Sequence, residues 1–132
     1  MTVVLAALTA LALLFLVQPF VFQLSCAMAG VKPPPVARAA GITFAVFVLG
    51  TLASLIWGLS GGLVLSFVHG GLGVVSGLAV VALVTAVITS AVLRISLGAG
   101  ARVAVVHHIL GALLSGLVTA VVYAAVALFI GV

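Results

Sequence analysis

Between Arg38 and Arg94, residues 39–93 read "AAGITFAVFVLGTLASLIWGLSGGLVLSFVHGGLGVVSGLAVVALVTAVITSAVL". This run has no charged side chain, and it is more than twice as long as the roughly 20 apolar residues that one helix needs to cross a bilayer. Two further uncharged runs, residues 1–31 and 103–132, each suit one crossing. Together the three runs predict four transmembrane helices, at about 3–28, 37–58, 68–93 and 103–129.

The composition excludes a water-soluble globular domain. The chain is 67% hydrophobic and 3% charged, with four Lys and Arg residues and neither Asp nor Glu. Soluble domains carry about 25% charged residues, which they need to cover their surface. We therefore expect an all-α integral membrane protein in which residues 1–132 form a single four-helix transmembrane domain, and we expect it in the bacterial inner membrane.

Three connectors join the predicted helices. Residues 29–36 contain three consecutive prolines, which cannot continue a helix. Residues 94–102 form a second, basic connector. The middle run turns at "WGLSGG" (Trp57–Gly62), where Trp suits a membrane interface and Ser with paired Gly suits a turn. The following "LVLSFVHGG" (63–71) is too short to cross and predicts a short interfacial helix.

The four basic residues gather on two of these connectors. Lys32 and Arg38 flank the first connector, while Arg94 and Arg102 bracket the last one. The middle connector and both ends of the chain carry no Lys or Arg. Under the positive-inside rule the two basic connectors are cytoplasmic, and the N- and C-termini lie outside. The same four side chains are the candidates for contact with anionic lipid.

A weak internal repeat is visible at an offset of 64 residues. Residues 25–41 align with 89–105, matching Ala27 with Ala91, Ala37 with Ala101 and Arg38 with Arg102. This alignment favours two tandem helical hairpins, each joined by a basic connector. Chance similarity within so restricted an alphabet is the alternative.

Small residues recur every fourth position on three predicted helices, and such rows let helices in a bilayer approach closely. The rows contain Gly50, Ser54 and Gly58; Gly73 and Gly77; and Gly111, Ser115 and Thr119. The last row belongs to "HHILGALLSGLVTAVVYAAVA" (107–127) and continues from His107 to Tyr123. We interpret the rows as helix-packing faces. A polar path for a substrate is the alternative.

The first predicted helix contains Pro19, which removes a backbone donor and predicts a kink. Gln18 and Gln23 lie beside it. Their amides either satisfy freed backbone groups or bridge to a neighbouring segment. A kinked, polar ligand site is the alternative.

Three side chains are candidates for binding a cofactor: His107, His108 and Cys26. His107 and His108 are candidate haem or chlorin ligands, and Cys26 is expected at a similar depth, where it could contact them. His69 lies 25 residues before Arg94, which places it at the opposite surface and apart from His107. The alternative is that the histidines are interfacial side chains, with no cofactor bound.

The absence of carboxylates removes the usual groups for carrying protons or binding Na⁺, Mg²⁺ and Ca²⁺ in a membrane. No nucleophile or metal motif occurs in the sequence. We therefore expect no enzymatic activity, no catalytic residues and no metal site.

The sequence thus predicts a non-catalytic membrane subunit or scaffold that packs within a larger assembly, such as a respiratory or light-harvesting complex. Its expected partners are the lipid bilayer, other membrane subunits and further copies of itself, with no nucleic acid. A second hypothesis is a self-assembling small pore or carrier for an anion or a neutral solute. A third is a haem- or pigment-binding subunit that uses His107 or His108.

Overall fold

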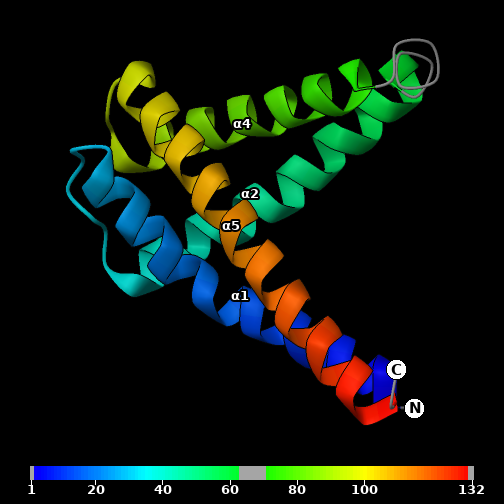
Figure 1. Ribbon diagram of the computed structural model, residues 1–132. Coiled ribbons are helices and arrows are strands. Elements are labelled where there is room, and N and C mark those ends of the chain that lie inside the picture. The colour runs from blue at the N-terminus through cyan, green and yellow to red at the C-terminus, as the bar shows by residue number, and fades with distance from the viewer. Residues whose placement is uncertain (1, 63–70, 131–132) are drawn as a thin grey trace.

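The structure is a computed structural model that describes residues 2–62 and 71–130. Within these residues the chain forms four α-helices and no strand (Figure 1). The helices are α1 (Thr2–Met28), α2 (Val36–Trp57), α4 (Leu72–Leu93) and α5 (Leu97–Ile130). A short element, η1 (Gly58–Gly62), follows α2 and is kinked at Gly61, whose φ of 124° is not helical. This kink lies within Trp57–Gly62, where the sequence predicts a turn. The predicted interfacial helix at 63–71 falls almost wholly on residues 63–70, outside the described residues.

Three described stretches are long and apolar enough to cross a membrane: Val36–Gly61, Leu72–Leu93 and Leu97–Leu128. The apolar stretch of α1, Ala12–Met28, is shorter than these three. The prediction of an all-helical chain with four long helices is therefore confirmed for the described residues. Three of the four expected crossings have the required length and composition.

Helix α5 begins at Leu97, well before the expected start at 103, so the connector expected at 94–102 is only three residues long. Ser96 caps this helix, because the N–H of Ala99 donates to Ser96 Oγ at 3.3 Å. The N–H of Gly100 donates to the Ser96 carbonyl at 3.0 Å. Gly98 and Gly100, which lie within the expected connector, are helical.

Helices α1 and α4 end in the same way. Gly30 follows α1 with a φ of 71°, and Arg94 follows α4 with a φ of 54°. In both cases an N–H bonds back to a carbonyl five residues earlier, as in a Schellman motif: Val31 to Cys26 at 2.8 Å, and Ile95 to Ser90 at 3.1 Å. The two motifs lie 64 residues apart, at the offset of the sequence repeat.

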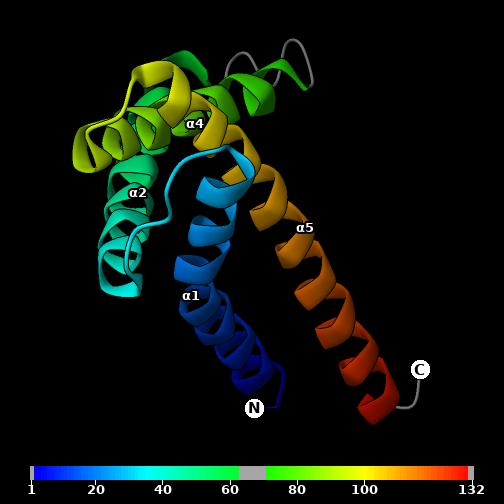
Figure 2. The same ribbon diagram turned by 90° about the vertical axis from the view of Figure 1, so that its left-hand side faces the viewer.

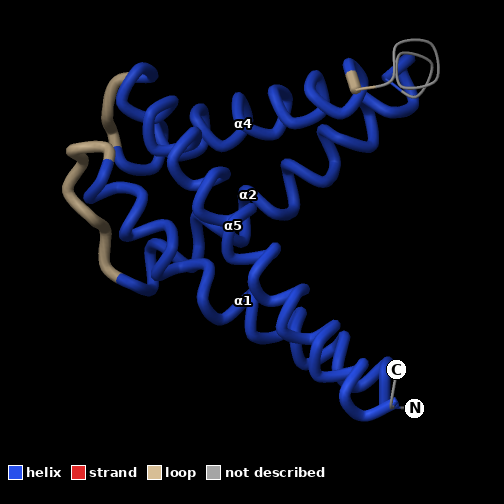
Figure 3. The backbone as a smooth tube through the Cα atoms, in the orientation of Figure 1, coloured by secondary structure: helices blue, strands red, loops and turns tan. Residues whose placement is uncertain are grey.

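The helices form two hairpins whose connectors lie at one end of the molecule, at the left of Figure 1. Helix α1 packs against α2 and α5, and α4 packs against α2 and α5. Away from the connectors the pair α1/α5 and the pair α2/α4 diverge, and we call these pairs the two arms (Figures 1 and 2). Figure 3 shows the two connectors as neighbouring loops at the end where the arms meet. Each arm combines the first helix of one hairpin with the second helix of the other.

The hydrophobic core lies at the connector end, where the helices meet. Its buried members come from three helices: Phe22, Cys26, Ala39, Ile42, Val46 and Val103. Ile88 and Leu93 of α4 pack against it. Beyond this core most large apolar side chains of the arms are exposed, for example Leu113 and Leu117 on α5. The described part of the chain is thus closely packed at one end and open at the other.

Helices α4 and α5 are in close contact at Gly100, which is buried. A Cβ atom at this position would lie 2.6 Å from the Ala86 carbonyl oxygen and would overlap Ser90 Oγ. Only glycine fits between these atoms without a backbone shift. This contact lies outside the small-residue rows singled out in the sequence.

Candidate binding cavity between the two arms

An open cavity of about 820 Å³ lies between the arms, and all four helices line it. Its wall is mostly apolar and includes Phe15 of α1 with Phe44 and Phe47 of α2. The rings of Phe15 and Phe47 meet edge to face, with centroids 4.9 Å apart and an interplanar angle of 81°. This volume is within the range of about 300–1,000 Å³ that is typical of small-molecule sites.

The polar groups of the wall are amide, imidazole and hydroxyl groups. They are the amide of Gln18, the two histidine imidazoles, and the hydroxyls of Thr43, Thr51, Ser54 and Ser115. No Lys or Arg is among the lining residues, and the sequence has no carboxylate side chain. Thr43 and Thr51 donate to carbonyls of their own helix at 3.0 and 2.7 Å. Their oxygens keep the capacity to accept a further hydrogen bond.

The small-residue rows of α2 and α4 lie in different surroundings. Gly50 is buried, and a Cβ there would meet Val81 Cγ1 of α4 at 3.4 Å, so this position belongs to a helix contact. Ser54 lines the cavity, whereas Gly58 in η1 faces open space. Gly73 is buried at the start of α4. A Cβ at Gly77 would meet nothing within 4 Å.

The row on α5 is not covered by another described helix. A Cβ at Gly111 would meet no atom within 4 Å, and both Gly111 and Ser115 line the cavity. Thr119 and Tyr123 continue the row and are exposed. That this row packs against a helix of another chain stays a prediction.

His107 is 7% exposed and borders the cavity. Its ring packs edge to face on Phe22, with centroids 5.6 Å apart. Its Nδ1 atom is buried and has no hydrogen-bond partner in the described chain. A buried polar atom without a partner is rare in folded proteins.

His108 joins α5 to α4. Its Nε2 atom lies 3.0 Å from Thr85 Oγ1. Thr85 Oγ1 also lies 2.8 Å from the carbonyl oxygen of Val81 in its own helix. Because Nε2 of His108 is engaged with this hydroxyl, a haem or chlorin bound through the same nitrogen would require the contact with Thr85 to break.

Cys26 is fully buried in the core, and no hydrogen bond joins it to His107 or His108, all three of which are described. A contact between Cys26 and a histidine, which the sequence allows, stays a hypothesis. Gln23, one of the two amides beside Pro19, donates from Nε2 to the Pro34 carbonyl at 2.8 Å and ties α1 to the first connector. Gln18 instead lines the cavity. His69 lies outside the described residues.

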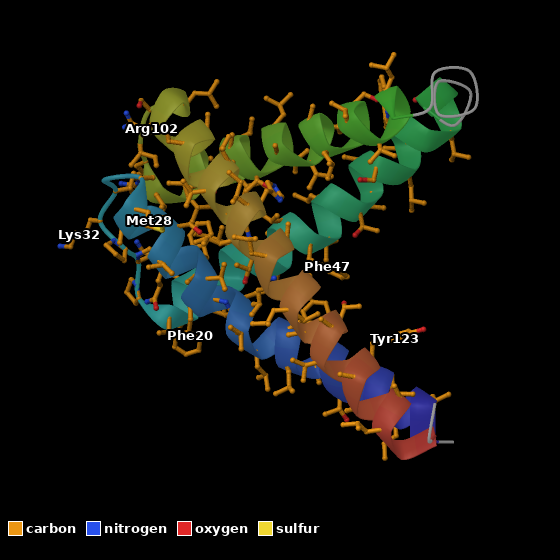
Figure 4. The ribbon with its side chains drawn as sticks, viewed as in Figure 1. Phe20, Met28, Lys32, Phe47, Arg102 and Tyr123 are labelled. Atoms are coloured by element: carbon orange, nitrogen blue, oxygen red, sulfur yellow. The ribbon has the colours of Figure 1, made fainter. Side chains whose placement is uncertain are left out.

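The four basic side chains are exposed at the connector end. Figure 4 shows Lys32 and Arg102 at this end, with Tyr123 far along α5. A second, shallower hollow there is lined partly by Met28 and Arg102. Their positions suit contact with lipid headgroups, which stays a prediction.

No family model, curated protein or solved structure matches this chain.

Proposed function

We propose that this chain is a non-catalytic integral membrane subunit that packs against other membrane-spanning chains through exposed helix faces. The observation that carries the proposal is the outer part of the α5 row, where Thr119 and Tyr123 are exposed. Small residues at four-residue spacing allow close helix approach, and no described helix of this chain occupies that face. The buried core at the connector end leaves the arms free to receive partners.

The proposal includes four crossings. Helix α1 has 27 residues, which at 1.5 Å per residue gives about 40 Å, enough for a hydrocarbon core of about 30 Å. The exposed basic residues lie at the connector end, so we propose that this end faces the cytoplasm. The bacterial inner membrane is the proposed location.

Cysteine labelling in intact cells tests this orientation. Gly98 and Ser60 are both exposed. Gly98 lies in the first turn of α5, next to the connector, whereas Ser60 lies in η1, which follows the far end of α2. With a membrane-impermeant maleimide, Ser60→Cys is expected to react from outside, and Gly98→Cys only after the cells are opened. The native Cys26 is fully buried, so the wild-type chain supplies an unlabelled baseline. Equal labelling of both sites in intact cells would contradict the orientation.

Native mass spectrometry after mild solubilisation tests the packing role. Thr119→Leu adds bulk to the row and is expected to reduce recovery of the assembly about tenfold, which corresponds to about 1.4 kcal/mol. Val121→Leu is the matched control, because Val121 is also exposed on α5 but lies outside the row. Recovery of a single chain from the wild type, or equal losses in both variants, would refute the proposal.

A second substitution at Thr119 separates the effect of side-chain bulk on assembly from the effect of side-chain polarity. Thr119→Val keeps the shape of the side chain and removes only its hydroxyl. Hydrogen bonds between helices in membranes average about 0.6 kcal/mol, so assembly should fall less than threefold. A larger loss than that of Thr119→Leu would favour a polar path over a packing face.

The cavity favours a second candidate, a small carrier for a neutral solute. Its described wall contains polar but uncharged side chains, and the basic residues lie elsewhere at the connector end. This arrangement supports a neutral solute better than an anion.

A further inference from the structure

We infer that the cavity between the arms binds an uncharged amphiphile, with an apolar chain or ring and one carbonyl or hydroxyl group. A lipid-soluble quinone and a long-chain alcohol share this chemistry. The inference does not depend on the packing role proposed above. It concerns the wall of the cavity between the two arms, whereas the packing role concerns the exposed part of the α5 row.

The apolar part of the wall suits the body of such a molecule. Phe15 and Phe47 form an edge-to-face pair on one side, and Phe44 lies beside them. Leu78 and Val81 of α4 add aliphatic surface. Aromatic and aliphatic walls with a few polar groups are typical of sites that bury most of a small ligand.

His107 supplies the polar recognition. It is the most deeply buried polar side chain of the wall, and its Nδ1 has no partner in the described chain. A neutral imidazole has one donor and one acceptor nitrogen. Nδ1 itself is shielded from the cavity, so a carbonyl or hydroxyl in the cavity meets the part of the imidazole ring that borders it.

The same wall disfavours a charged occupant. A carboxylate, phosphate or ammonium group buried in this cavity would find no opposite charge among the lining residues. Burying an unpaired charge costs far more than burying an unpaired hydroxyl. Anionic headgroups are instead expected near the exposed basic residues at the connector end.

Gly111 keeps the cavity open. Because a Cβ at this position meets nothing within 4 Å, a leucine side chain can extend into the cavity without disturbing the helices. Gly116 lies on the same helix and is equally unobstructed, but it is exposed and does not line the cavity. Gly111→Leu and Gly116→Leu therefore form a matched pair.

Photolabelling in phosphatidylcholine nanodiscs tests the inference. Three diazirine probes of equal chain length are compared: an alcohol, a carboxylate and an alkane. In the wild type and in Gly116→Leu, we expect the alcohol to label cavity-lining segments of α1, α2 and α5. Gly111→Leu should lower this labelling about tenfold, and the carboxylate should label these segments several-fold less than the alcohol.

His107→Phe tests the polar contact, because it keeps a ring against Phe22 and removes both nitrogens. It should lower labelling by the alcohol several-fold and leave labelling by the alkane unchanged. Unlabelled dodecanol and a decyl-substituted quinone then compete for the site, and the stronger competitor identifies the ligand class. Equal labelling by all three probes, wild-type labelling in Gly111→Leu, or no competition by either compound would overturn the inference.

Discussion

Replacing Phe22 with alanine is expected to lower the free energy of unfolding by about 3 kcal/mol, the lower end of the range for buried Phe→Ala changes. Phe22 is fully buried and is the largest such side chain in the described chain. It contacts the core residues of the connector end and the ring of His107. In a bilayer the loss of stability arises from missing packing contacts and the remaining void rather than from transfer of the side chain to water. We therefore expect a value at the lower end of the range measured for buried Phe→Ala changes.

Equilibrium unfolding in mixed micelles, with increasing dodecyl sulfate, measures this effect. Phe20→Ala is the matched control, because Phe20 lies two residues earlier on α1 and is 56% exposed (Figure 4). Its substitution should change the free energy of unfolding by less than about 0.5 kcal/mol. Equal destabilisation by the two variants would show that the connector end is not the core of the folded chain.

Replacing Gly100 with alanine is expected to cost about 1–3 kcal/mol, the range for overpacking a close contact. The added Cβ would lie 2.6 Å from the Ala86 carbonyl oxygen, so α4 and α5 must move apart. Removing the Ser90 hydroxyl as well, in Gly100→Ala/Ser90→Ala, should restore only part of the stability. The backbone carbonyl remains in that double variant.

Gly98→Ala is the control for helix propensity, since a Cβ there meets no atom within 4 Å. Both substitutions replace glycine by alanine in the first turns of α5, where alanine favours the helix by up to about 1 kcal/mol. Gly98→Ala should therefore raise stability in the same unfolding experiment. A rise for both variants would contradict the close approach of α4 and α5 at Gly100.

The charge-free runs were enough to predict the helices, because an uncharged run of known length fixes how many helices it can supply. The start of α5 was harder to predict from the sequence. Gly98 and Gly100 favour a loop by propensity, and tertiary packing against α4 overrides that preference at Gly100. Ser96, which caps the helix, was the local signal for the earlier start.

The candidate site was only partly predictable. Four-residue spacing tells which residues share a helix face, but not what lies opposite that face. Gly50 and Gly111 belong to similar rows, yet Gly50 meets Val81 while Gly111 opens onto the cavity. The pairing of His108 with Thr85 joins residues 23 positions apart, and no short-range pattern indicates such a contact.

The exchange of helices between the two arms has a consequence for biosynthesis. Of the four described helices, α1 is synthesised first and α5 last, yet these two helices are neighbours in one arm. The arm made of α2 and α4 is complete as soon as α4 has left the ribosome. Helix α1 lacks its neighbour in this arm until α5 has been made. The α1/α5 arm is therefore completed only after α5 has been made, and the first hairpin alone holds one helix of each arm.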